Sequence, residues 1–334
     1  MRKTSAWGNT LPGSKLERHE IVLKELGPDE MRMEVLYCGL CQSDLIQIDG
    51  LTGRTGLPLI PGHEVVGRVV SVGAGVDPIH VGSLRGLGWI SGNCRHCQWC
   101  LSGRQTLCDN LEMTVIGRTG GFANEVQAHQ DWLIKIPDGI EPAIAGPLFC
   151  GGATVFEPLI SGEISPTASV AIIGIGGLGH LAVQITRAWG CHVTGITTSK
   201  AKEEEIRELG AHDVELLSNL HNLKGKYDLI INTSYHALDW DAVIASLAPQ
   251  GRLHQLGFNW KPIPIKLFPF GKGNLTFTSS LTASPAITGK MLNFCARHNI
   301  RPKVEILPMP QINTAIERLR CGDVRYRFVL QGPA

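Results

Sequence analysis

Hydrophobic and polar residues follow different patterns on the two sides of residue 166. Before it, short β-type runs such as Met33–Tyr37, Glu64–Val72 and Trp132–Ile136 are separated by turn residues, which predicts an irregular, mostly β domain. After it, apolar strands alternate with helical stretches, as βαβ units require. We expect one doubly wound parallel sheet, with helices through Trp189 and over Lys200–Leu209 and strands at Val170–Ile173, Val193–Ile196, Leu229–Asn232, Arg252–Leu256 and Leu275–Thr278.

The last stretch of the chain is too short to form a domain of its own. Its pattern predicts a helix at Pro285–His298, a strand, a helix at Ile312–Arg320 and a β run at Arg325–Leu330. We therefore expect it to complete the first domain, with the parallel-sheet domain inserted. This α/β chain would divide into residues 1–151 with 280–334, and residues 152–279.

Composition narrows the class of partner. The 334 residues are 43% hydrophobic and 18% charged, with a formal net charge of +1, as in a globular protein. Because no basic block is present, we expect a small-molecule substrate and no nucleic acid. No apolar run of signal-peptide length follows Arg2 and Lys3, and the most apolar stretches fall short of the roughly 20 residues that cross a bilayer. We expect a cytoplasmic protein with no membrane partner.

Four cysteines form a C-x2-C-x2-C-x7-C array: Cys94, Cys97, Cys100 and Cys108. This spacing brings four thiolates within reach of one tetrahedral Zn²⁺ and leaves no coordination position for substrate. We predict a structural zinc that folds a loop too polar to form its own core. Free or disulfide-bonded cysteines and an iron–sulfur cluster are the alternatives, although Asp109 stands where ferredoxin-like runs carry proline.

Further ligand types are scattered through the chain: Cys41, the adjacent His63 and Glu64, and Cys150. Two sulfurs and one imidazole leave one tetrahedral position open, which a Lewis-acid zinc needs in order to bind a substrate oxygen. Spacing alone gives weak support, because a single histidine or cysteine is more often a core or turn residue than a ligand.

The run Gly62–Gly67, which reads GHEVVG and is followed by Gly73, resembles the signature of zinc-containing medium-chain alcohol dehydrogenases. The resemblance extends to the four-cysteine array, to Cys150 and to the C-terminal run Gly322–Arg327. Its nearest subgroup is that of the cinnamyl-alcohol-dehydrogenase-like enzymes and bacterial aldehyde reductases. It implies a GroES-like catalytic domain, an inserted Rossmann domain, two zinc ions per chain and a homodimer.

Matching positions carry the family's roles as expectations. Cys41, His63 and Cys150 match the ligands of the catalytic zinc. Glu64 matches an acidic neighbour that can approach the metal. The four-cysteine array matches the structural zinc site.

Residues around these ligands match supporting roles. Ser43 matches the hydroxyl of the proton relay, and Asp44 matches the carboxylate that orients the ligand histidine; the alternative is that both belong to a turn and a cap. Trp89 lies where relatives place a pocket-lining side chain, or it is a core tryptophan. Ile46 departs from the family, because many relatives carry there a histidine that passes the relay proton to solvent.

A glycine motif, GIGGLG, closes the first apolar strand of the second half and opens a helix, as dinucleotide binding demands. Its backbone would bring N–H groups to the pyrophosphate at the positive end of the helix. The residues expected to bind the cofactor here are Gly174, Gly176, Gly177, Leu178 and Gly179.

The end of the next strand bears on the choice of cofactor. An acidic residue at that place binds the ribose 2′-hydroxyl and repels a 2′-phosphate. Here the first acidic residue after the strand is Glu203. Hydroxyls and cations can hold the 2′-phosphate instead, so NADP(H) is predicted; if these residues only cap the next helix, the choice stays open. The residues concerned are Thr197, Thr198, Ser199 and Lys202, with Lys200 beside them.

These features predict a zinc-dependent oxidoreductase that interconverts primary alcohols and aldehydes, aromatic or medium-chain, with NADP(H). One alternative is an NADPH-dependent reductase of C=C or iminium bonds on the same fold, against which the retention of Ser43 and Glu64 argues. The other is a zinc-containing, nucleotide-sensing binding module, against which the near-neutral charge and the complete open metal site argue.

Overall fold

The computed structural model describes residues 2–53, 58–256 and 262–332. The chain folds into two compact units, Met1–Cys150 with Ser284–Ala334, and Gly151–Ala283. The junctions therefore fall between residues 150 and 151 and between residues 283 and 284, whereas the sequence pattern places them after 151 and before 280.

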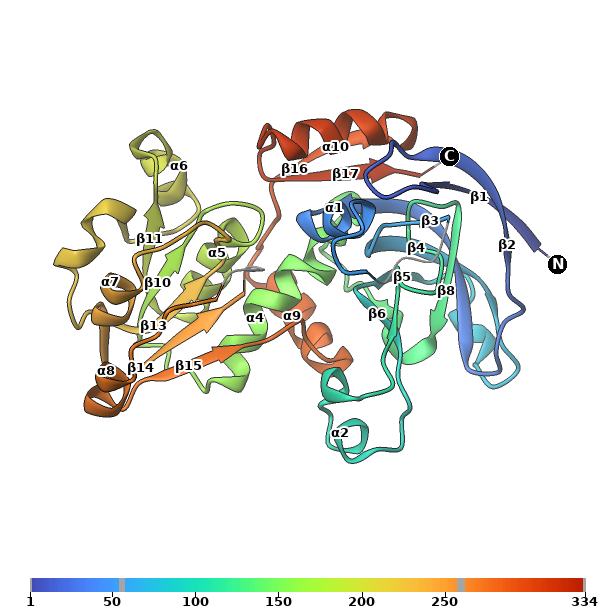
Figure 1. Cartoon of the computed structure of the whole chain (residues 1–334). Coiled ribbons are helices and arrows are strands. Elements are labelled where there is room, and N and C mark those ends of the chain that lie inside the picture. The colour runs from blue at the N-terminus through green and yellow to red at the C-terminus, as the bar shows by residue number, and fades with distance from the viewer. Residues whose placement is uncertain (1, 54–57, 257–261, 333–334) are drawn as a thin grey trace. The chain divides into compact units, whose positions relative to one another are not determined.

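The first unit is built around a seven-stranded sheet of order β16-β17-β3-β4-β5-β9, with β8 also paired to β3. β17 runs antiparallel to β3, so the end of the chain belongs to this sheet. Helix α10 (Ile312–Arg320) lies along β16 and β17 (Figure 1). The strands are β3 (Glu30–Leu40), β4 (Glu64–Val72), β5 (Leu84–Leu87), β8 (Glu125–His129), β9 (Ile134–Lys135), β16 (Val304–Pro308) and β17 (Arg327–Gln331).

The strand predicted over Trp132–Ile136 is wrong at its start. The 3-10 turn η3 occupies Gln130–Trp132, and only β9 is extended. The turn places Trp132 in the core, where it is 4% exposed, so burial of a large aromatic side chain outweighs its preference for a strand.

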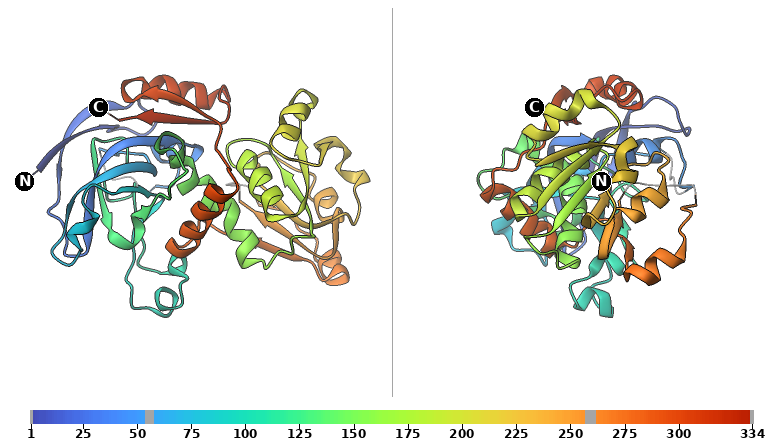
Figure 2. Two further views of the ribbon diagram at one scale, coloured as in Figure 1. Left: turned by 180° about the vertical axis from the view of Figure 1, so that it is seen from behind. Right: turned by 90° about the vertical axis from the view of Figure 1, so that its left-hand side faces the viewer.

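Shorter elements complete the first unit. Two-stranded sheets form from β1 and β2 and from β6 and β7. The four-cysteine segment forms a lobe, residues 94–108, that projects from the main sheet of its unit (Figure 2). The bounds are β1 (Arg2–Gly8), β2 (Glu17–Leu23), β6 (Ile90–Gly92), β7 (Glu112–Met113), α1 (Gln42–Ile48), η1 (Pro78–His80), α2 (Gln98–Leu101), η2 (Gln105–Leu107), α3 (Pro142–Ala145), η4 (Gly146–Phe149), α9 (Pro285–Arg297) and η7 (Met309–Gln311).

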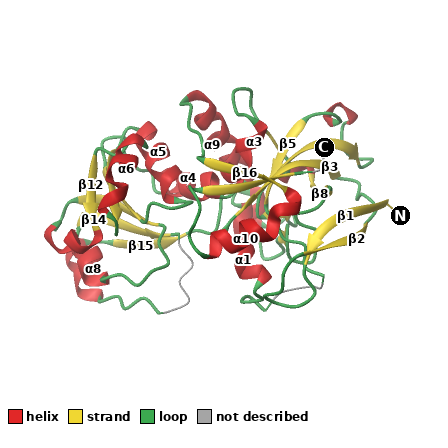
Figure 3. Ribbon diagram, turned by 90° about the horizontal axis from the view of Figure 1, so that it is seen from above, coloured by secondary structure: helices red, strands yellow, loops and turns green. Residues whose placement is uncertain are grey.

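The second unit is a six-stranded parallel sheet of order β12-β11-β10-β13-β14-β15. Helices flank its strands (Figure 3). β12 is missing from the strands predicted above, because its four residues are all half-buried and two are acidic. The elements are α4 (Gly151–Ser161), β10 (Ser169–Ile173), α5 (Gly179–Trp189), β11 (His192–Thr197), η5 (Lys200–Lys202), α6 (Glu203–Glu208), β12 (Asp213–Leu216), η6 (Leu217–Asn222), β13 (Tyr227–Asn232), α7 (Trp240–Ala245), β14 (Leu247–Gln255), α8 (Leu267–Gly273) and β15 (Thr276–Ser279).

In the part of the chain that the structure describes, no single helix is long and apolar enough to cross a membrane. The helical stretches Pro142–Phe149 and Gly151–Ser161 reach that length only as a bent pair, and most of their residues are buried in the protein.

Candidate metal and nucleotide sites

Asp44 joins two chain segments that are distant in sequence. It lies in the first turn of α1, and its Oδ2 accepts a hydrogen bond of 3.0 Å from the N–H of the N-cap residue Cys41. Its Oδ1 accepts bonds from the N–H of Gly62, at 2.9 Å, and from Nδ1 of His63, at 3.0 Å. One fully buried carboxylate thus holds the helix start and the Gly62–His63 segment together.

This bond fixes the tautomer of the neutral imidazole. Because a carboxylate only accepts, Nδ1 of His63 carries a proton, and in the neutral imidazole Nε2 is then the nitrogen with the lone pair. Nε2 lies 3.3 Å from Sγ of Cys41 and 3.4 Å from Sγ of Cys150. A tetrahedral zinc would separate such N and S ligands by about 3.6 Å, so the donor set fits zinc in both chemistry and spacing.

Glu64 is the fourth member of this group, whose ligand atoms all lie within 4.8 Å of one another. Its Oε1 accepts a hydrogen bond of 2.9 Å from Nη1 of Arg327, and its buried Oε2 has no hydrogen-bond partner. Burial raises the pKa of the Glu64 carboxyl to about 7, although the Arg327 guanidinium opposes this shift. The Glu64 carboxylate therefore lies near Cys41, His63 and Cys150, and its Oε2 makes no hydrogen bond of its own.

Opposite pKa shifts occur on neighbouring groups of this cluster. Burial opposes the imidazolium of His63, but the charges of Asp44 and Cys41 dominate and raise its pKa. Burial also opposes the Cys41 thiolate, but hydrogen bonding to Cys150 and the charge of His63 lower its pKa well below the usual value. Such divided shifts are typical of functional sites, and a thiolate is the form that binds metal.

The supporting residues named from the sequence lie close to the ligands. The N–H of Ser43 donates to Sγ of Cys41 at 3.3 Å, and Ser43 is half-buried. Trp89 packs against His63 with ring centroids 4.7 Å apart. Ile46 is buried in α1 and has no group that could transfer a proton.

The four cysteines of the lobe converge as their spacing predicts. Neighbouring sulfurs lie 3.4–3.8 Å apart, close to the separation of about 3.8 Å that a tetrahedral ZnS4 site gives. None of the ten cysteines of the chain forms a disulfide, so the disulfide alternative is wrong. The sulfurs belong to Cys94, Cys97, Cys100 and Cys108.

Asn93 connects the lobe to the core of its unit. Its Nδ2 donates to Sγ of Cys100 at 2.9 Å, and its Oδ1 accepts from Nε1 of Trp132 at 2.8 Å. The roles of Asn93 and Arg327 were not predicted from the sequence. Asn93 lies outside the ligand motifs, and Arg327 acts through Glu64, which is 263 positions away in the chain.

The glycine motif forms the turn between β10 and α5 in the second unit. Gly174 has φ +87°, and a Cβ on Gly179 would lie 2.0 Å from the carbonyl oxygen of Gly174. A Cβ on the exposed Gly176 would point into open space, which leaves room for a phosphate to approach the backbone. Thr233, also missed from the sequence, closes the turn by donating its hydroxyl to the carbonyl of Gly174 at 2.6 Å. Gly177 and Leu178 complete the run.

The residues expected at a 2′-phosphate follow β11. Thr198 is exposed, and Ser199 and Lys202 are half-buried. Thr197 differs from them, because it is buried and its hydroxyl accepts from the N–H of Ser199 at 3.2 Å. Thr197 therefore shapes the segment rather than facing solvent.

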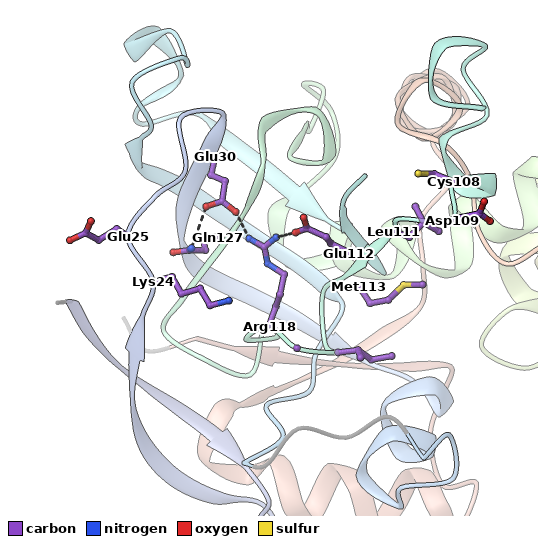
Figure 4. A pocket seen from close by; sticks show the side chains of 12 residues that line it. Lys24, Glu25, Glu30, Cys108, Asp109, Leu111, Glu112, Met113, Arg118 and Gln127 are labelled. Atoms are coloured by element: carbon purple, nitrogen blue, oxygen red, sulfur yellow. Dashed lines mark hydrogen bonds and ion pairs between the residues drawn. The ribbon is translucent and has the colours of Figure 1, made fainter. Parts of the chain in front are cut away.

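A hollow of about 600 Å³ borders the lobe. Figure 4 shows Arg118 between the carboxylates of Glu30 and Glu112, with Gln127 donating to Glu30. These polar groups satisfy one another, and no member of the Cys41–His63–Cys150 group lines the hollow. The hollow is therefore separate from that group.

Comparisons with known proteins agree with this arrangement. Residues 27–138 match the alcohol dehydrogenase GroES-like domain, and residues 177–297 match the zinc-binding dehydrogenase domain. An aldehyde reductase of Synechocystis sp. is 48% identical over 95% of each chain. An NADP-dependent alcohol dehydrogenase of Mycolicibacterium smegmatis is 34% identical over 99% of this chain and 98% of its own.

A solved structure of an alcohol dehydrogenase has the same fold. The cinnamyl alcohol dehydrogenase of Sorghum bicolor superposes with a TM-score of 0.94 and 30% identity, over 99% of this chain and 98% of the other. A GroES-like unit with two thiol-rich clusters, joined to a parallel dinucleotide-type sheet, defines a zinc-dependent oxidoreductase. The chain belongs to the medium-chain, zinc-binding alcohol dehydrogenase family.

Proposed function

We propose that this enzyme interconverts primary alcohols and aldehydes with NADP(H), and that the group formed by Cys41, His63 and Cys150 is its catalytic metal site. The observation that carries the proposal is the set of N–S distances of 3.3 and 3.4 Å around His63 Nε2, which leaves one tetrahedral position for a substrate oxygen. The first unit would be the catalytic domain and the second the cofactor domain. Zinc bound here would polarise the carbonyl oxygen, and NADPH would supply the hydride.

The chain's own residues prepare this site. Asp44 keeps a proton on Nδ1 of His63, so that Nε2 is the nitrogen that would bind the metal. Arg327 balances the negative charge that two thiolates and Glu64 bring into a buried region. In reduction, Ser43 would deliver the proton that the product alcohol gains. Since Ile46 ends the family's usual path, water or a cofactor hydroxyl would return that proton to Ser43.

For cofactor choice, the exposed Thr198 and the half-buried Ser199 and Lys202 follow the end of β11, where they would contact a 2′-phosphate. Two hydroxyls and a cation supply charge-assisted hydrogen bonds to that group. The M. smegmatis relative is NADP-dependent, which supports the same assignment. We assign the pyrophosphate to the turn at Gly174–Gly179, at the start of α5.

The decisive experiment follows NADPH oxidation with benzaldehyde and cinnamaldehyde. Wild type should turn over both aldehydes. Cys150→Ala should lose at least about 100-fold in kcat/KM and one of two zinc ions. Cys295→Ala, which removes a buried thiol of the same unit, should keep both the activity and the zinc. Turnover of activated C=C or iminium substrates, with none of aldehydes, would replace the proposal by the reductase alternative.

We also propose that two copies pair through the edge of the parallel sheet. β15 has a single neighbouring strand, and Phe277 and Leu281 beside that edge are 37% and 48% exposed. Pairing would cover an edge that is otherwise prone to association. Wild type should have the mass of a dimer by light scattering, and Phe277→Lys should lower it. We propose a cytoplasmic location as well, because cysteines that form no disulfide fit a reducing compartment.

A further inference from the structure

The indole of Trp89 meets the imidazole of His63 almost at a right angle. The ring centroids lie 4.7 Å apart and the planes make an angle of 88°, an arrangement that aromatic pairs prefer. Trp89 lies between β5 and β6, is half-buried and packs on the core of the first unit. A rigid aromatic surface therefore stands against the ring that carries Nε2.

Backbone contacts fix the position of Trp89. The N–H of Thr114 donates to the Trp89 carbonyl at 2.9 Å. The hydroxyl of Thr114 donates to the carbonyl of the preceding residue, Gly88, at 2.6 Å. Thr114 is only 1% exposed. The segment is thus held by the fold itself, without help from a substrate.

Asp44 restrains the imidazole of His63 at one atom only. The single hydrogen bond at Nδ1 tolerates a tilt of the ring plane, and such a tilt would carry Nε2 away from the sulfurs of Cys41 and Cys150. An indole perpendicular to the imidazole blocks this movement by steric contact. Its exposed part can still face a substrate, so the two roles do not compete.

We propose that Trp89 is a positioning residue that keeps Nε2 of His63 directed at the catalytic metal. This inference rests on the proposed function, since it takes His63 as a metal ligand. Trp89 then acts through His63, whereas a residue that only lines the substrate pocket would affect the binding of aldehydes and not the metal.

Metal release tests this directly, because it does not depend on turnover. Wild type, Trp89→Phe, Trp89→Leu and Trp89→Met would be loaded with two zinc ions and mixed with excess chelator and a zinc indicator. Zinc should leave the two sites in two kinetic phases. Cys150→Ala lacks the zinc of the open site, so its single phase identifies release from the lobe. We expect Trp89→Leu and Trp89→Met to speed zinc release from the open site by about 10-fold or more, as loss of other groups that orient ligands does. Trp89→Phe should speed it by less than about 2-fold. The lobe phase should not change, which shows that the variants are folded.

Cobalt substitution supplies a spectroscopic check. The visible spectrum of Co²⁺ at the open site should change in Trp89→Leu or Trp89→Met and return toward wild type in Trp89→Phe. Equal release rates and unchanged cobalt spectra in both non-aromatic variants would overturn the inference, even if KM for aldehydes rises. A wild type that binds zinc only in the lobe would instead overturn the proposed function.

Discussion

Arg327 and Glu64 form a buried ion pair with Nη1 and Oε1 2.9 Å apart, although 263 residues separate them in the chain. Their side chains are 6% and 0% exposed. The pair ties β17, from the end of the chain, to the start of β4, where the ligand His63 precedes Glu64. The last strand therefore contributes directly to the charge balance of the proposed metal site.

Arg327→Met should be severely destabilising, because it leaves a carboxylate buried without its counter-charge. Removing one partner of a buried pair costs about 3–5 kcal/mol. In the double variant Glu64→Gln with Arg327→Met, the cost should be well below the sum of the two single changes. Urea unfolding of the zinc-loaded protein, analysed as a double-mutant cycle, measures this coupling. Additive single and double effects would show that the pair is not coupled.

Asn93→Leu should loosen the zinc of the lobe. The change removes the amide that donates to Sγ of Cys100 and leaves Nε1 of Trp132 without its acceptor. Loss of such a partner typically weakens metal binding about 10-fold or more. Chelator competition measures it, and Asn110→Leu is the matched control, because only the backbone of Asn110 contacts a lobe sulfur. Equal zinc affinity in both variants would refute this role for Asn93.

Cofactor preference should respond to charge at the end of β11. Lys202→Ala should raise KM for NADPH about 10-fold through loss of a charge-assisted contact, with little change in KM for NADH. Ser199→Glu should reverse the preference, because an acid at this place repels the 2′-phosphate. Steady-state kinetics with both cofactors tests this, with the exposed Lys224→Ala as control. Parallel changes for NADH and NADPH would place the phosphate elsewhere.

His254 should make the protein less stable in mild acid. Burial lowers the pKa of His254 to about 4, while the unfolded chain binds this proton near pH 6.5. Between these values the unfolded state holds more protons, so stability is complete above about pH 6.5 and falls as the pH drops.

The contribution of His254 amounts to about 2 kcal/mol between pH 7 and pH 5. His254→Gln keeps a polar group near Thr278 and Ser280, the hydrogen-bond partners of the ring, and should flatten the pH dependence of unfolding by that amount. The exposed His221→Gln is the control. The same pH dependence in wild type and His254→Gln would contradict the prediction.

Local patterns were sufficient for several elements. The strand at Glu64–Val72 and the helix at Ile312–Arg320 have the predicted bounds, because the strand is rich in β-branched valine and the helix repeats apolar residues every three or four positions. The turn at the glycine motif and the convergence of the four cysteines could also be predicted, since both depend on residues that are close together in the chain. The edge strand Asp213–Leu216 could not be predicted, because its half-buried, partly acidic residues lack a strong apolar period.

By itself, the sequence determined the two kinds of domain and the types of ligand, because short-range periodicity and spacing encode them. Only the tertiary structure brought Cys41, His63 and Cys150 together and placed Asp44, Trp89 and Arg327 around them. These contacts join residues from separate strands and helices, so they depend on how the sheet and its connections pack. No local pattern in a single chain records that packing.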